Sequence, residues 1–478
     1  MLRFIKRYAA LFFVTAAFHS FSVAIASENI PITLKEAWSM VNANNDALKA
    51  ARAGVKQAEF TKLGTKSLNL PDISLGANYL YLDDDVELSP DELFQSMEGG
   101  IIAAQFAAGL AQSYGLTPTQ LNGGLTSTIS ERELLSSSIR GSWPLYTGGR
   151  ISAAQDIAVS QVQEARYNLQ QKNLLQFQKL VHNYFGAVLA QQVLNTRRDV
   201  ELGLGQHRDH AILLEQQGQI ARVEMMQSEA SFDKAVVDRK KAERDLEIAR
   251  LALTRMLKSS QSVRPSEELF IASSLPSVDE FIGDTLRSYP GLGILDAKIE
   301  QAAGLASIEK GKYLPSVAVV GNYSLYEEES LATSLTPDWF LGVGVSISLL
   351  ERSGRSGKFQ AARSAMQRLE HLSHQAQSDL TLFVEKNYRH TMQALEEFYG
   401  LGSSQKLAEE NVSLRIKAFN QGLGTSLDVV DAELFLADVK TQRAVAAFNY
   451  VDALGQLMGV SSSPETFFTY QNNQGIEE

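Results

Sequence analysis

None of the 478 residues is a cysteine, and the chain has few long apolar runs. Without cysteine the chain forms no disulfide bond and offers no N-terminal cysteine for a lipid. Beyond residue 26 no run of 18 apolar residues is long enough for a helical membrane span. The nearest approach, residues 99–116, is interrupted by Gln105 and Gln112, and we expect a short loop helix there.

One apolar run stands at the N-terminus and reads "MLRFIKRYAALFFVTAAFHSFSVAIA". The basic residues Arg3, Lys6 and Arg7 precede it, and the small residues 24–26, Ala-Ile-Ala, follow it. This order predicts a secretory signal peptide over residues 1–26, cleaved after Ala26. We therefore expect an exported protein.

Positive charge is also scarce, with 44 Lys and Arg against 55 Asp and Glu. Removal of the signal peptide takes away three positive charges and no negative ones, so the net charge falls from −11 to −14. Such acidity argues against nucleic acid or anionic lipid as a partner.

Proline is missing from two long stretches, 145–264 and 338–463. Proline costs about 3 kcal/mol in a helix interior, so stretches without it can form long helices. Apolar residues recur there at three-four spacing, as in Leu174, Phe177 and Val181. We predict helical hairpins over 150–257 and 356–457. A helix over 151–216 would be ~100 Å long, which suits either a coiled-coil rod or the wall of a tube.

Each predicted hairpin has glycine where the chain must turn, Gly218 in the first and Gly422 with Gly424 in the second. These positions belong to an internal repeat. "LNLPDISLGANYLY" (68–81) resembles "YLPSVAVVGNYSLY" (313–326), and Gly149-Arg150 and Gly354-Arg355 follow in the same order. The same order of segments in both halves of the chain predicts two structural repeats, 27–262 and 263–460. The remaining 461–478, rich in Ser, Asn, Gln and Glu, is expected to be a disordered tail.

Each repeat contains two segments in which apolar and polar residues alternate. The four segments predict strands over about 72–82, 136–145, 316–326 and 340–350. Such alternation fits a membrane β-strand or a small soluble sheet. Four strands cannot enclose a pore, so if they cross a membrane several chains must share one barrel, and three chains give twelve strands. The fold class expected is mainly α with a small β portion.

The order of these features resembles the TolC-like outer-membrane efflux family. The resemblance rests on the signal peptide, the duplicated helix–strand–strand–long helix–helix pattern, "WPLYTGGR" (143–150) after a strand, and "GLGTSLDVVDAEL" (422–434) at a helical turn. It covers about 33–460. It implies a homotrimer with one twelve-stranded barrel in the outer membrane of a Gram-negative bacterium and a helical tunnel in the periplasm.

The resemblance also implies partners and a role. Such channels dock with a periplasmic adaptor (membrane fusion protein) and an inner-membrane transporter, and they export drugs or secreted proteins without catalysing a reaction. Multidrug efflux and type I secretion both remain open. The alternative is a soluble periplasmic coiled-coil adaptor that bridges the two membranes, although neither a lipoyl-like domain nor a membrane anchor is recognisable.

Two acids near the second turn, Asp428 and Asp431, match the family's periplasmic gate ring. Three chains would bring six carboxylates together, and two charges ~6 Å apart repel by ~3 kcal/mol at an effective dielectric of 20. Such a ring would select cations. The alternative for Asp428 is a helix cap, because Thr425 stands three residues before it. The first-repeat counterparts of the two acids are Glu224 and Gln227.

The tyrosine and arginine that lock the gate in this family fall at Phe419 and Gly424 here. The family's lock is therefore absent or built differently. We expect closure to depend on helix packing and on a substitute pairing of Arg222 with Asp428 or Glu224.

Two histidine pairs, His207 with His210 and His371 with His374, each share one helix face. A metal site or surface histidines would explain them, and surface histidines are the interpretation adopted, since no cysteine or obvious acid completes a site. The sequence contains no complete nucleotide-binding motif and no hydrolase or zinc-protease motif. We expect no enzyme activity, no cofactor and no metal.

The segment 83–137 opens with three aspartates and would lie at the extracellular mouth of a barrel. It is either a loosely packed loop or a partial lid over the exit.

Overall fold

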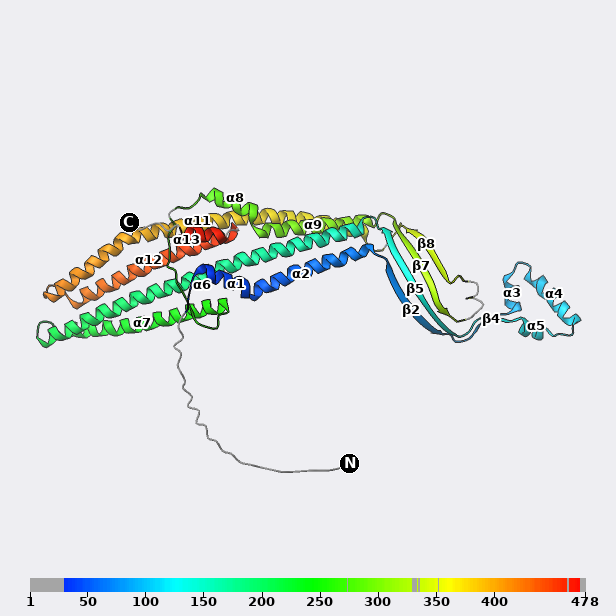
Figure 1. The fold of residues 1–478 in the computed structure, drawn as a ribbon, viewed down its shortest axis with the longest axis horizontal. Coiled ribbons are helices and arrows are strands. Elements are labelled where there is room, and N and C mark those ends of the chain that lie inside the picture. Colours follow the sequence, from blue (N-terminus) through cyan, green and yellow to red (C-terminus); the bar gives the residue numbers. More distant parts are fainter. Residues whose placement is uncertain are drawn as a thin grey trace, which may run out of the picture.

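A computed structural model describes residues 30–272, 274–328, 333, 336–350, 352–461 and 464–472. They form one elongated molecule, with long helices at one end, a narrow sheet that continues from the ends of the helices, and a small helical insertion beyond the sheet (Figure 1). The predicted signal peptide, 1–26, lies outside the described residues.

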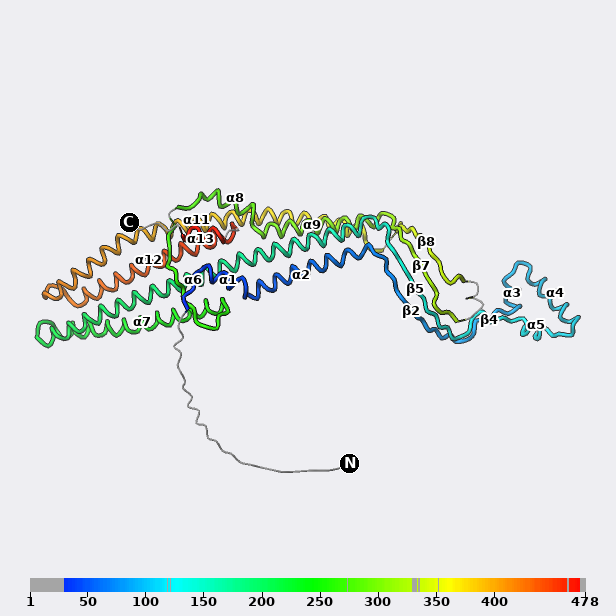
Figure 2. The backbone as a smooth tube through the Cα atoms, in the orientation of Figure 1, coloured from blue at the N-terminus to red at the C-terminus, as the bar shows by residue number. Residues whose placement is uncertain are grey.

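Four long helices make most of this length, and they run side by side along the molecule (Figure 2). They are α6 (Arg150–Gln216), α7 (Arg222–Leu257), α11 (Arg355–Asn420) and α12 (Ser426–Val460). The pairs α6–α7 and α11–α12 form two hairpins in the stretches without proline, and α12 also packs on α6. The hairpins are therefore joined through the longer helix of the first and the shorter helix of the second.

Shorter helices precede each pair of strands. These are α1 (Leu34–Asn44) and α2 (Asp46–Lys66) in the first half, and α8 (Val278–Ser288) and α9 (Pro290–Gly311) in the second. A 3₁₀ turn, η1 (Ser67–Asn69), leads out of α2. Each half opens on a short strand, and β1 (Ile30–Ile32) pairs in parallel with β6 (Val263–Pro265). The two halves therefore repeat one order of elements.

The central sheet is antiparallel and has the order β2-β5-β7-β8. Its strands are β2 (Asp72–Tyr81), β5 (Glu133–Tyr146), β7 (Ser316–Glu327) and β8 (Trp339–Ser346). β5 begins before the predicted 136. β8 ends before the predicted 350, because its last partner on β7 is Ser316, where β7 itself begins.

The two outer strands, β2 and β8, each have one edge without a partner strand among the described residues. Large apolar side chains alternate along them and are exposed, including Ile73 and Leu75 on β2 and Leu341 and Val343 on β8. An exposed, apolar sheet with two open edges requires a covering partner or a lipid environment.

A glycine joint connects the sheet to the long helices. Gly148 and Gly149 both have positive φ where β5 passes into α6, and Gly354 has positive φ before α11. A Cβ atom on Gly148 would lie 2.4 Å from the carbonyl oxygen of Gly311, and one on Gly311 would lie 2.6 Å from that of Gly148. The two repeats therefore touch here through bare backbone.

The largest core lies midway along the helices, where the short segments wrap the hairpins. Aromatic rings of α6, including Phe177 and Phe185, pack on Phe467. Phe467 belongs to α13 (Pro464–Asn472), so the predicted disordered tail 461–478 is wrong for these residues. The tail is polar in composition, but three of its aromatic residues, Phe467, Phe468 and Tyr470, pack on the core.

The insertion between β2 and β5 is a small folded unit. Its ribbon is β3 (Val86–Leu88) and β4 (Ser127–Ser130), and its helices are α3 (Pro90–Ser96), α4 (Gly100–Ser113) and α5 (Pro118–Leu125). The expected loop helix of residues 99–116 is α4. Among the described residues no helix combines the length and apolar character needed to cross a membrane.

Candidate functional site at the hairpin tips

The two hairpins turn in the same way. In the first, the amide of Gly218 donates to the carbonyl of Glu215 (2.8 Å) and that of Gln219 to Leu214 (2.9 Å). In the second, Gly422 donates to Phe419 (3.0 Å) and Leu423 to Ala418 (2.9 Å). Both turns are Schellman motifs, and the positive φ of Gly218 and Gly422 meets their requirement for a left-handed residue.

Gly424, the third glycine predicted to turn the chain, is different. It is not among the glycines with positive φ in the described chain, and a Cβ there would make only ordinary contacts, the nearest with Ala418. Of the three glycines, Gly218 and Gly422 turn the hairpins by their conformation.

Asp428 caps the helix that follows the second turn. Its backbone amide donates to the Thr425 hydroxyl (3.3 Å), and its own carboxylate accepts from the Thr425 amide (2.9 Å). The other carboxylate oxygen accepts from Arg415 on α11 (3.0 Å). The bonds from Thr425, followed by the charge of Arg415, hold the pKa of Asp428 below its ordinary value. The capping alternative for Asp428 is therefore what the chain shows.

Asp431 lies one helical turn further on and faces solvent. Its carboxylate makes no hydrogen bond or ion pair with the other described residues. Of the first-repeat counterparts, Gln227 is half-buried and Arg222 is exposed. The expected pairing of Arg222 with Asp428 or Glu224 is wrong within the chain, because Asp428 pairs with Arg415 and Glu224 binds a backbone amide.

Glu224, at the start of α7, reaches across to the other hairpin. Its carboxylate accepts a 2.7 Å hydrogen bond from the amide of Ser426, the first residue of α12. Ser426 is fully buried, and its hydroxyl lies 2.7 Å from Nε2 of His207 on α6. We name His207, Glu224 and Ser426 the tip clamp. It connects three helices from both repeats, and Ser426 is about 200 residues from the other two members in sequence.

Burial explains the properties of His207, which the sequence suggested was a surface histidine. The residue is only 7% exposed. Its pKa is lowered to about 4, first by burial and then by the neighbouring His210, while Glu224 opposes the shift. His207 is therefore neutral near pH 7 and serves packing and hydrogen bonding. His371 and His374 are exposed. No group of His, Asp and Glu suited to a metal occurs among the described residues.

Phe419, for which the resemblance implied a tyrosine, is buried in the tip. It is 2% exposed and packs with Ala211, Leu214 and Val429, which come from α6 and α12. Its ring also meets the ring of His207 edge-on, 4.6 Å between centroids. Phenylalanine has no hydroxyl to donate, so this position contributes packing rather than a hydrogen-bonded lock.

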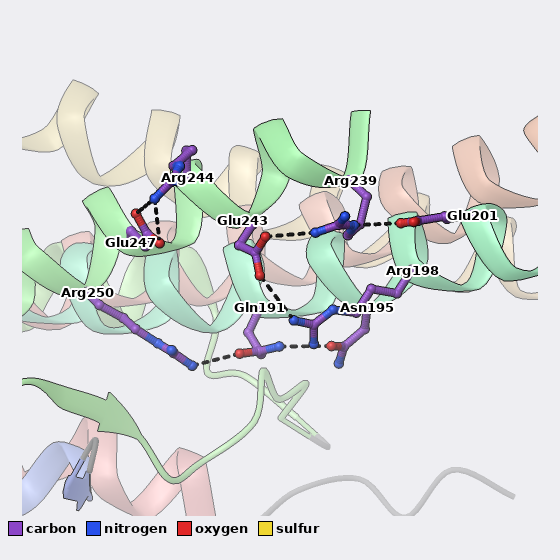
Figure 3. A network of polar contacts seen from close by, with 9 residues as sticks. All are labelled: Gln191, Asn195, Arg198, Glu201, Arg239, Glu243, Arg244, Glu247 and Arg250. Atoms are coloured by element: carbon purple, nitrogen blue, oxygen red, sulfur yellow. Dashed lines mark hydrogen bonds and ion pairs between the residues drawn. The ribbon is translucent and has the colours of Figure 1, made fainter. Parts of the chain in front are cut away.

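Further along the first hairpin, charged residues bind α7 to α6 (Figure 3). Arg239 of α7 bonds Glu201 of α6 (2.6 Å) and Glu243 of its own helix (2.8 Å), and Glu243 also lies 3.6 Å from Arg198. Single exposed pairs contribute less than about 1 kcal/mol, but a shared network holds the register of two helices more firmly. We expect the first hairpin to move as one body.

Neither Arg415 nor the tip clamp is predicted by the sequence. Arg415 could have been found, because it precedes the turn by nearly as many residues as Asp428 follows it, and such positions face each other across a hairpin. The clamp could not, since no local pattern connects His207, Glu224 and Ser426.

Comparison with known proteins gives a clear result for the fold. No protein-family model matches the sequence, and no curated protein is significantly similar to it. Solved structures do match. CusC, described for its transmembrane channel formation, shares 13% identity and covers 91% of this chain and 94% of its own, with a TM-score of 0.71. This chain has the fold of an outer-membrane channel.

Two further channel structures agree over similar lengths. The outer membrane protein VceC of Vibrio cholerae shares 13% identity and covers 90% of this chain and 96% of its own, with a TM-score of 0.69. The open state of the Neisseria gonorrhoeae MtrE outer membrane channel shares 16% identity and covers 90% of this chain and 89% of its own, with a TM-score of 0.69. The channel fold therefore extends over nearly the whole chain.

Proposed function

We propose that the protein is an outer-membrane export duct of a Gram-negative bacterium. Three copies would join their sheets, β8 of one to β2 of the next, into a barrel of twelve strands. The observation that carries this proposal is the four-stranded sheet, whose two outer edges are open and whose apolar side chains are exposed. Closure satisfies the edges, and lipid covers the apolar residues.

The helical part would continue the barrel as a tunnel into the periplasm. α6 and α11 contain 67 and 66 residues, about 100 Å each at 1.5 Å per residue. We infer that the tips dock with a periplasmic adaptor and an inner-membrane transporter, which supplies the energy for export of drugs or secreted proteins. The duct itself would be passive and not an enzyme.

A soluble periplasmic adaptor is the less favoured function. In a soluble adaptor, a sheet with two open edges and exposed apolar residues would be left uncovered in water. The fold likeness to outer-membrane channels also extends over 90% or more of the chain.

Membrane fractionation and planar-bilayer recording test the duct. We expect a detergent-extractable trimer in the outer-membrane fraction and discrete conductance steps after reconstitution. A monomer that remains soluble without detergent would refute the proposal. Deletion of the gene, with measurement of drug susceptibility and secreted proteins, would distinguish the two classes of substrate.

We further propose that Asp428 and Asp431 ring the periplasmic entrance of the trimer and select cations. The exposed Asp431 is free to face the passage, whereas Asp428 is partly neutralised by Arg415. We therefore expect Asp431→Asn to reduce cation selectivity and block by trivalent cations more than Asp428→Asn. Asp438→Asn, at an exposed acid further along α12, is the matched control. If all three variants keep the cation selectivity of the parent channel, the ring is excluded.

A further inference from the structure

The insertion between β2 and β5 has an unusual charge distribution. Residues 82–131 contain no Lys, Arg or His, and residues 99–130 contain no charged residue at all. The charges that the insertion does carry are acidic and stand before residue 99 or at Glu131. A surface segment without charge over 32 residues requires an explanation, because exposed segments are normally charged.

Helix α4, in the middle of the insertion, exposes its large apolar side chains and buries its small ones. Its alanines, among them Ala104, Ala107 and Ala111, are half-buried or buried, and α4 packs on α3 and α5. Large residues on and just after the helix face outward, and they are Ile101, Ile102 (74% exposed), Phe106 (73%), Leu110 and Tyr114 (80%). We name these five residues the α4 stripe. A helix of a soluble unit normally buries its large apolar residues and exposes its small ones.

A lipid surface is a poor occupant for this stripe. Helices that lie on membranes carry Lys and Arg that meet anionic headgroups, and residues 82–131 have neither. The insertion also projects beyond the ends of the strands, along the long axis of the molecule (Figure 1).

A second copy of the chain is the better occupant. The insertion joins β2, the outer strand whose open edge would meet the neighbouring subunit, to the adjacent strand β5. It therefore lies on the half of the sheet that would face the next copy. Because residues 99–130 are uncharged, three identical stripes can approach one another without electrostatic repulsion.

We propose that the α4 stripes of the three subunits pack against one another and form an apolar cap over the outer mouth of the barrel. The inference rests on the proposed trimer. It assigns residues 83–130 an interface role, with Phe106 near its centre, and predicts that the cap narrows the exit by an apolar constriction.

The lack of cysteine makes a cross-linking test direct. In the Phe106→Cys variant, mild oxidation with copper phenanthroline and oxygen should join two of the three subunits by a disulfide, since their Cβ atoms would approach to about 4 Å. Gln95→Cys, at an exposed position on α3, is the matched control and should remain unlinked. Trimer content, measured on unheated gels of the same samples, tests the duct separately.

A charge in the stripe provides the second test. We expect Phe106→Asp to keep the trimer but to raise single-channel conductance by roughly twofold or more, because repulsion opens the cap. Gln95→Asp should leave the conductance unchanged.

The two tests together separate the cap from the duct. The cap is overturned if the trimer is intact, the Phe106→Cys variant stays unlinked, and the Phe106→Asp variant conducts as the parent does. Reaction of the introduced thiol with a membrane-impermeant maleimide would then show whether the stripe faces water or lipid. Either result overturns the cap and leaves the proposed duct intact. Absence of a trimer in the parent chain would refute the duct itself.

Discussion

The first hairpin passes from α6 into α7 at Gly218, and the second passes from α11 into α12 at Gly422, with equivalent backbone hydrogen bonds in both turns. Their second helices begin differently. α7 follows Ala221, whose side chain cannot cap a helix, whereas α12 follows Thr425 and has a complete capping box with Asp428. α12 is also held by the other hairpin at its first turn, through Glu224 and His207.

The two helix starts are therefore held unequally. The start of α12 is anchored to α6, α7 and α11, while the start of α7 supplies an anchor without a side-chain cap of its own. An opening motion that moves the second hairpin outward must break the tip clamp or take the first hairpin along. Four measurements at the tips test this asymmetry.

Removal of the Phe419 ring should have the largest effect. Phe419→Ala empties a buried aromatic site, which costs about 3–5 kcal/mol. Its first-repeat equivalent is Glu215, so the loss should be confined to the second tip. Hydrogen exchange over residues 418–430 measures the free energy of local opening. Leu423→Ala, at a side chain 78% exposed in the same turn, is the control and should change it by less than about 0.5 kcal/mol. Equal exchange in the two variants would contradict the buried anchor.

Loss of the Glu224 carboxylate should rank second. Glu224→Ala leaves the buried amide of Ser426 without its acceptor, a cost of about 1–3 kcal/mol. Exchange of the Ser426 amide should accelerate accordingly, while Glu229→Ala, at an exposed acid on the same helix, should have no effect. If the Ser426 amide stays protected in Glu224→Ala, the two hairpins are not joined in this way.

Acidification should loosen the clamp through His207. Its pKa is lowered from 6.5 to about 4 in the folded chain, so the folded state binds this proton less readily than the unfolded one. The stabilisation is complete above pH 6.5 and is lost as the pH falls towards 4. The protection factor of the Ser426 amide should fall across this window. In His207→Gln the histidine's contribution disappears, and an unchanged pH profile in that variant would disprove its role.

A new cap on the first hairpin should have the smallest effect. Ala221→Ser supplies a hydroxyl at the N-cap of α7 and should stabilise it by about 0.5–1 kcal/mol, whereas Thr425→Ala should cost α12 a similar amount. If the protection of the α7 start rises in Ala221→Ser and that of the α12 start falls in Thr425→Ala, capping accounts for the difference in stability between the two helix starts. Shifts of the same sign would mean that other contacts dominate.

Much of the fold could be predicted, because its signals are local. Stretches without proline, a glycine at each turn and alternating residues in the strands reflect propensities that act within a few residues. The end of β8 was overestimated because it depends on where β7 begins. The helix α13 was missed because its stability comes from a distant core rather than from its own composition.

The site could be predicted only in part. Asp428 was open to two interpretations, and capping could be anticipated from Thr425, but its ion pair with Arg415 requires the geometry of the hairpin. Glu224 was expected to be an acid of the entrance, yet it binds the amide of Ser426. Contacts across about 200 residues are decided by tertiary packing, on which a single sequence carries no direct information.

The glycine joint between sheet and helices has a genetic consequence. Since Gly148 and Gly311 face each other's carbonyl oxygens, any side chain at either position collides with the main chain. A second mutation can shorten a side chain but cannot remove main-chain atoms. Second-site suppressors of a substitution there should therefore be rare, and saturation mutagenesis should recover only glycine at both codons. Protein engineers who wish to graft a different sheet onto these helices would have to keep both residues.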